Sequence, residues 1–109
     1  MLRNWKLYLE DMQESAQRVM EYTAGLDQKT FLCNRLRYDA TLRNLEILGE
    51  AVKHLPVDVK NKHPDIDWRG IREFRNFVTH AYFKVDPDIL WDVITRKVPQ
   101  LSEQLKQVS

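Results

Sequence analysis

The chain has 109 residues, 43% of them hydrophobic and 30% charged, a length that fits one domain over residues 1–109 and excludes a second. Its 17 Lys and Arg against 16 Asp and Glu leave a formal charge of +1, which excludes binding of nucleic acid through a strong overall field. The single cysteine, Cys33, excludes an internal disulfide framework and a zinc site built from cysteines.

Helical periodicity runs along nearly the whole chain. Only 3 Gly and 4 Pro occur, and apolar residues recur at helical spacing, whereas alternating runs rich in β-branched residues are missing. The sequence therefore predicts an all-α fold. The first long helix is expected to end near Gly25, and its narrow apolar stripe consists of Leu2, Trp5, Leu9, Met12, Ala16, Val19 and Thr23.

A second long helix is expected between Asp27, a favourable N-cap residue, and Pro56, which ends it. Its apolar stripe again follows the helical period and consists of Phe31, Tyr38, Leu42, Leu45, Leu48, Val52 and Leu55. Residues 57–62 have the length of a helical turn or two. Residues 63–66 are typical of a loop, because Pro64 disfavours a helical conformation in the residue before it.

Two further helices complete the predicted fold. A third main helix begins after its cap, Asp67, and ends near residues 82–84. Its apolar residues are Trp68, Ile71, Phe74, Phe77, Val78 and Ala81. A last helix begins at Asp86, with Pro87 in its first turn, and Pro99 either kinks or restarts it.

Large aromatic side chains are numerous for so short a chain, with three Trp, four Phe and four Tyr. A domain of this size buries only about 60 to 65% of the surface that its unfolded chain exposes. We therefore expect part of the apolar surface to face a partner, and a homodimer with a helical interface is the simplest arrangement.

A local basic surface is predicted on the third main helix, where Arg69, Arg72 and Arg75 stand against a single glutamate. At 100° per residue, Asn76 and His80 lie on one side of the helix, beside a strip that contains Arg72 and Arg75. The apolar residues take the other side. The helix thus presents guanidinium, amide and imidazole groups along one polar edge.

These groups suit the cleavage of a phosphodiester. The His80 imidazole can take or give a proton at neutral pH, and the Arg75 guanidinium can bind a phosphate through two parallel hydrogen bonds. In metal-free RNA hydrolysis, a base activates the ribose 2′-OH and a cation stabilises the charge that develops on the phosphorane. Because acid and base are both needed, a two-fold axis that brings two copies of His80 together would complete the site.

Simpler interpretations stay open for each of these groups. A lone His and Arg on a helix are more often a hydrogen-bonded or solvated pair than a catalytic one. His63 and the nearby aspartates are compatible with a metal site, but loop and capping roles explain them, and no metal is assigned. For Glu50, a place at the edge of the core is favoured over a catalytic role.

The segment from Arg75 to Tyr82 resembles the Arg-x4-His-x-Tyr signature of the HepT proteins, a branch of the HEPN superfamily. Residues 43–51, with Gly49, Glu50 and Ala51 at their end, resemble the Gly-Glu-Ala segment of that family, and residues 66–68 resemble the start of its motif helix. The resemblance covers roughly residues 3–106. Two departures are Asp67, where the family frequently has proline, and Thr79, where an aliphatic residue is common.

The resemblance implies an antiparallel HEPN-type helical bundle that dimerises with its two motifs facing each other in a cleft. It implies a metal-independent endoribonuclease that acts as the toxin of a prokaryotic toxin-antitoxin pair. By the same resemblance, Arg75 and His80 are catalytic, Asn76 and Arg72 support them, and no cofactor is needed. The antitoxin would be an MntA-like nucleotidyltransferase that transfers AMP to Tyr82, a residue that could otherwise simply pack at the helix end.

Two other functions remain as alternatives. In the first, the same cleft is a non-catalytic binding module that holds the nucleotidyltransferase or its nucleotide, and the Arg75 and His80 side chains serve recognition only. In the second, the protein is a purely structural helical dimer. No segment approaches the roughly 20 apolar residues needed to cross a bilayer, and a signal peptide is not evident at the start. The sequence thus predicts a cytoplasmic protein with no membrane partner.

Overall fold

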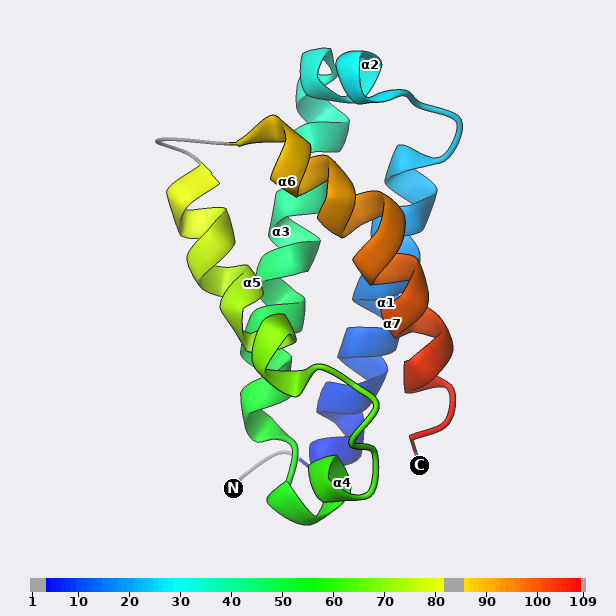
Figure 1. The fold of residues 1–109 in the computed structure, drawn as a ribbon, viewed down its shortest axis with the longest axis vertical. Coiled ribbons are helices and arrows are strands. Elements are labelled where there is room, and N and C mark those ends of the chain that lie inside the picture. Colours follow the sequence, from blue (N-terminus) through cyan, green and yellow to red (C-terminus); the bar gives the residue numbers. More distant parts are fainter. Residues whose placement is uncertain (1–3, 82–85, 109) are drawn as a thin grey trace.

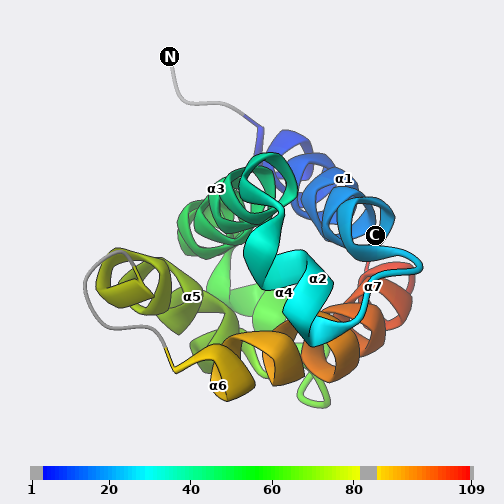
Figure 2. The same cartoon turned by 90° about the horizontal axis from the view of Figure 1, so that it is seen from above.

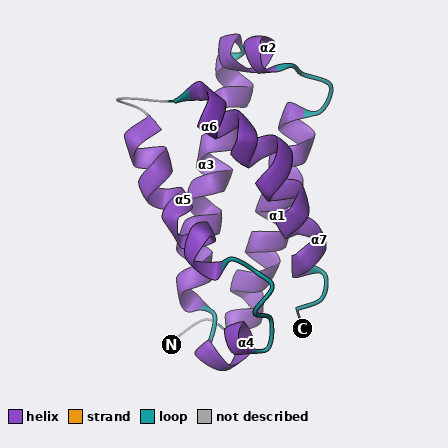
Figure 3. Ribbon diagram, viewed as in Figure 1, coloured by secondary structure: helices purple, strands orange, loops and turns teal. Residues whose placement is uncertain are grey.

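Helices joined by turns and short loops make up the whole described part of the chain, residues 4–81 and 86–108, in a computed structural model (Figure 3). No strand occurs in these two ranges, so the predicted all-α fold is confirmed. The molecule measures 40 × 25 × 22 Å along its principal axes.

Helix α1 (Trp5–Thr23) follows the predicted stripe closely. The Asn4 side chain caps it by accepting a hydrogen bond from the Lys6 N–H at 2.9 Å. Its buried face consists of Leu9, Met12, Ser15, Ala16 and Val19. The chain turns at Gly25, whose φ of 75° lies in the left-handed region that glycine adopts without a steric cost. The predicted end of the first helix is therefore confirmed.

The single second helix predicted from Asp27 to Pro56 is wrong, because the chain breaks at Asn34. Helix α2 (Gln28–Cys33) is capped by Asp27, and helix α3 (Arg35–Ala51) starts after Asn34, whose side chain accepts from the Arg37 N–H at 3.1 Å. The apolar period hid the break, since Phe31 and Tyr38 are two helical turns apart whether or not the helix is continuous. A 3₁₀ turn, η1 (Val52–His54), then leads to Pro56.

Helix α4 (Val57–Asn61) and helix α5 (Trp68–Ala81) agree with prediction in the described residues. The Asp67 carboxylate accepts a hydrogen bond from the Gly70 N–H at 2.9 Å and so supplies the predicted N-cap. The Trp68 indole N–H donates to the carbonyls of Lys60 and His63, each at 3.1 Å, and ties the loop to α5. The predicted end of this helix near residues 82–84 lies outside the described residues.

The C-terminal arm is one bent helical rod in three pieces. Helix α6 (Pro87–Asp92) has the predicted cap, with the Asp86 carboxylate accepting from backbone N–H groups of the first turn. A π-helical turn, η2 (Val93–Lys97), precedes helix α7 (Val98–Leu105). Pro99 lacks the N–H that would continue an α-helical ladder, which accounts for an irregular turn at this point.

The long helices run up and down as antiparallel neighbours, with α1 beside α3, α3 beside α5, and α7 against α1 (Figures 1 and 2). Helix α2 covers the top of the bundle and α4 lies at its bottom. The largest fully buried side chains are Phe31, Met12, Leu42, Leu45, Leu48, Leu90, Ile94 and Leu105. Some large apolar side chains remain exposed, notably Leu36 at 80%, Val57 at 68% and Ile89 at 53%.

Candidate active site on helix α5

Helix α5 carries most of the predicted site residues. Arg72, Arg75 and Asn76 all lie on it with exposed side chains. His80 also belongs to α5, one helical turn beyond Asn76, but its side chain lies outside what the structure describes. Tyr82 lies wholly outside the described residues. The structure therefore describes the arginine half of the motif and the backbone position of the histidine.

Gly49 allows α3 and α5 to touch through their backbones. A Cβ atom at Gly49 would lie 2.8 Å from the Arg75 backbone nitrogen and 3.1 Å from the Arg75 Cβ. These distances are too short for any larger residue, so only glycine permits this approach. The contact fixes the Arg75 backbone against α3, one residue before Glu50.

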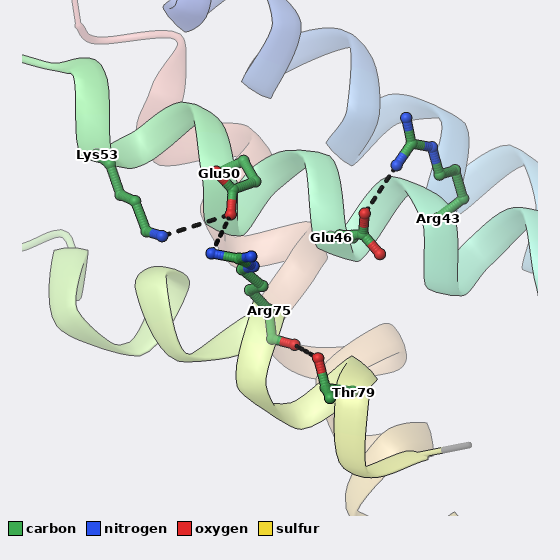
Figure 4. Close-up of polar contacts among 6 residues, drawn as sticks. All are labelled: Arg43, Glu46, Glu50, Lys53, Arg75 and Thr79. Atoms are coloured by element: carbon green, nitrogen blue, oxygen red, sulfur yellow. Dashed lines mark hydrogen bonds and ion pairs between the residues drawn. The ribbon is translucent and has the colours of Figure 1, made fainter.

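Glu50 binds the guanidinium that the backbone contact brings near. The Arg75 NH1 group lies 2.7 Å from the Glu50 Oε1 atom, and the Lys53 ammonium lies 3.4 Å from the same oxygen (Figure 4). The side chains of Arg75 and Glu50 are 52% and 43% exposed, so solvent screens the pair and its contribution to stability is at most about 1 kcal/mol. The pair therefore orients Arg75 more than it stabilises the fold.

From the sequence, Glu50 is either a surface group or one that touches the motif helix from behind, with a place at the edge of the core favoured over catalysis, and Lys53 has no role. The structure places the half-exposed Glu50 carboxylate against the motif arginine, and Lys53 beside it. Glu50 and Arg75 stand on different helices, so no helical spacing could reveal their contact. The only signal was the Gly-Glu-Ala segment, whose glycine marks a close helix crossing.

The polar neighbours of Arg75 on α5 form hydrogen bonds within the same helix. The Asn76 amide donates to the Glu73 Oε2 atom at 3.0 Å. The Thr79 hydroxyl donates to the Arg75 carbonyl at 3.0 Å (Figure 4). Asn76 is thus held on its own helix by Glu73, and its side chain is exposed. The Thr79 hydroxyl, one residue before His80, therefore donates its hydrogen bond to the helix backbone.

The other candidates turn out to have structural roles. Among the described residues, no group of three or more His, Cys, Asp and Glu side chains is arranged to hold a metal ion. Asp67 caps α5, and the His54 ring stacks on Tyr8 with centroids 4.1 Å apart, which ties η1 to α1. Within the described ranges, none of the helices combines the length and apolar character that a bilayer-spanning segment requires.

The family model described as ribonuclease HepT-like matches residues 12–108, so the chain belongs to the HepT-like family. The chain is 38% identical to "Probable ribonuclease HepT" of Thermococcus cleftensis, over 99% of this chain and 98% of that protein.

Two further relatives have a comparable extent. A candidate RNase of Methanocaldococcus jannaschii is 34% identical over 97% of this chain and 97% of its own length. A candidate RNase of Caldanaerobacter subterraneus subsp. tengcongensis is 34% identical over 93% of this chain and 90% of its own. No solved structure matches the chain significantly.

Proposed function

We propose that the protein is a metal-independent endoribonuclease and the toxin of a toxin-antitoxin pair, with RNA as its substrate. The observation that carries the proposal is the exposed Arg75 guanidinium, oriented by Glu50 on a helix that also bears His80, in a chain of a ribonuclease family. A cytoplasmic location fits this proposal and stays a prediction.

The proposed reaction needs only side chains. A His80 imidazole removes the proton of a ribose 2′-OH, and the 2′-oxygen attacks the adjacent phosphorus while the bond to the 5′-oxygen of the next nucleotide breaks. A second imidazole protonates that leaving oxygen. Arg75 stabilises the negative charge on the phosphorane, and Asn76 and Arg72 support it by hydrogen bonding to the substrate. The products are a 2′,3′-cyclic phosphate and a 5′-hydroxyl.

The need for two imidazoles predicts a homodimer, because each chain carries one motif and a two-fold axis duplicates it. The exposed Leu36, Val57 and Ile89 side chains are compatible with such a contact, but they stand on three different helices, α3, α4 and α6, and define no single dimer patch. Sedimentation at micromolar concentration is expected to give about twice the chain mass of 13.0 kDa. A monomer that still cleaves RNA would contradict the shared site.

The proposed control of the nuclease is AMP transfer to Tyr82 by an MntA-like nucleotidyltransferase. The added AMP carries negative charge and bulk close to His80 in sequence, so it should compete with the RNA phosphate for Arg75 and block access. Incubation with the nucleotidyltransferase, ATP and Mg²⁺, followed by peptide mass spectrometry, is expected to find the adduct on Tyr82 and a loss of cleavage. Tyr82→Phe should stay active and unmodified.

Two results would refute this regulation: an adduct found only on other residues, or a fully modified protein that cleaves RNA as fast as before.

The alternative function is a non-catalytic subunit that binds the nucleotidyltransferase or its nucleotide. The observation that favours this binding function is that the Arg75 guanidinium is already paired with Glu50 in the isolated chain. Incubation of the purified protein with a long RNA in excess EDTA separates the two functions, because a binding subunit leaves the RNA intact.

A further inference from the structure

Two arginines of α5 differ from the other arginines of residues 4–81 and 86–108. The side chains of Arg69 and Arg72 are exposed, and neither guanidinium makes a hydrogen bond or an ion pair with a described residue. Elsewhere in the described ranges, each arginine contacts a carboxylate or a carbonyl; these are Arg18, Arg35, Arg37, Arg43, Arg75 and Arg96. The two unpartnered guanidinium groups are neighbours, one helical turn apart, and Arg75 follows one turn later.

These arginines line a groove that is continuous with the candidate active site. The groove has a volume of about 340 Å³, and its walls are Lys53, Arg69, Arg72, Glu73, Arg75 and Asn76. Its acidic member, Glu73, is engaged by the Asn76 amide. We call it the α5 groove. From Arg69 to Arg75 it follows about 9 Å of helix.

The charge around the α5 groove is concentrated and poorly neutralised. Burial lowers the pKa of the Lys60 ammonium below its usual value, and the positive charge of Arg72 lowers it further. Arg72 therefore lies close enough to a second cation to repel it, although the net charge of the whole chain is only +1. The walls carry four cations, Lys53, Arg69, Arg72 and Arg75, against the single carboxylate of Glu73, and Glu50 pairs with Lys53 and Arg75. The remaining excess of positive charge favours an anion as a further partner.

We propose that the α5 groove binds the sugar-phosphate backbone of an RNA strand beside the bond that is cut, with Arg69 and Arg72 on phosphates outside the reacting one. The identity of the ligand rests on the proposed function, whereas the anion site rests on the unpartnered guanidinium groups. A planar guanidinium binds a phosphate through two hydrogen bonds and reads no base. Binding through this groove is therefore strongly salt-dependent and nearly independent of sequence.

The test measures binding without cleavage. A fluorescein-labelled single-stranded RNA with 2′-O-methyl riboses lacks the nucleophile, and its fluorescence anisotropy is followed over a series of KCl concentrations. Arg69→Ala and Arg72→Ala are each expected to weaken binding roughly tenfold at low salt and to reduce the salt slope by about 0.7. Arg18→Ala is the matched control, since Arg18 is ion-paired with Glu14 on α1 and lies outside the groove.

If both groove variants bind the RNA with the affinity of Arg18→Ala, the proposal is overturned. Unchanged RNA affinity together with lost binding to the nucleotidyltransferase would also overturn it and assign the groove to a protein partner. If the groove arginines are needed for binding but unmodified RNA is never cut, the nuclease proposal fails and the anion site stands. Circular dichroism of both variants should remain that of the parent, because the two side chains are exposed.

Discussion

Alanine in place of His80 or Arg75 is expected to abolish RNA cleavage and leave the fold intact. Loss of a general acid or base costs about 100- to 10,000-fold in rate, and loss of one group that stabilises the transition-state charge costs about 100- to 1000-fold. The Arg75 side chain is 52% exposed and its ion pair is screened, so its removal should barely change stability. Initial rates on a labelled RNA, with circular dichroism alongside, measure both effects.

The chain offers matched controls for these two substitutions. Arg43 pairs with Glu46 at 2.8 Å on the same helix that provides Glu50, so Arg43→Ala removes an equivalent surface ion pair away from the motif (Figure 4). His63→Ala removes a loop imidazole. Both controls should keep the parental rate. If the Arg75 and His80 variants cleave RNA at the parental rate, their catalytic roles are refuted and the alternative of a binding subunit is favoured.

Gly49→Ala is expected to destabilise the protein and to reduce its activity together. Within a helix, alanine is normally better than glycine by about 0.5 to 1 kcal/mol. Here the new methyl group would lie 2.8 Å from the Arg75 backbone nitrogen, so α5 must move away from α3, at a cost of about 1 to 3 kcal/mol. The same movement carries Arg75 away from Glu50.

Urea unfolding of the parent and of Gly49→Ala measures the sign of this effect. A variant as stable as the parent or more stable would show that the helices do not meet closely at Gly49. A destabilised variant with full activity would separate the packing of Arg75 from its function. In either case the close contact would not position the site.

The local signals in the sequence were enough for most of the fold. The three predicted caps, Asp27, Asp67 and Asp86, all cap helices, because a short polar side chain accepts hydrogen bonds from the free N–H groups of a first turn. The break at Asn34 escaped prediction because the apolar residues on its two sides keep the same helical phase. The π-helical turn before Pro99 was likewise not specified by any pattern, although the proline marked its place.

The candidate site was predictable only in part. The motif residues Arg75, Asn76 and His80 lie within one short helix, where spacing and resemblance both apply. The contact of Arg75 with Glu50 depends on how two helices cross, a tertiary property that helical periodicity does not encode. The unpartnered state of Arg69 and Arg72 depends on Glu73, which lies on the same helix and bonds to Asn76 rather than to them.

The central claim is that side chains alone cut RNA through the ribose 2′-OH, and the chemical ends of the products test it most directly. The purified protein is incubated with a defined RNA in excess EDTA, and the fragments are identified by mass spectrometry. The account predicts fragments that end in a 2′,3′-cyclic phosphate and begin with a 5′-hydroxyl, with the same rate as in Mg²⁺. A strict need for Mg²⁺, or fragments with a 3′-hydroxyl and a 5′-phosphate, would contradict it.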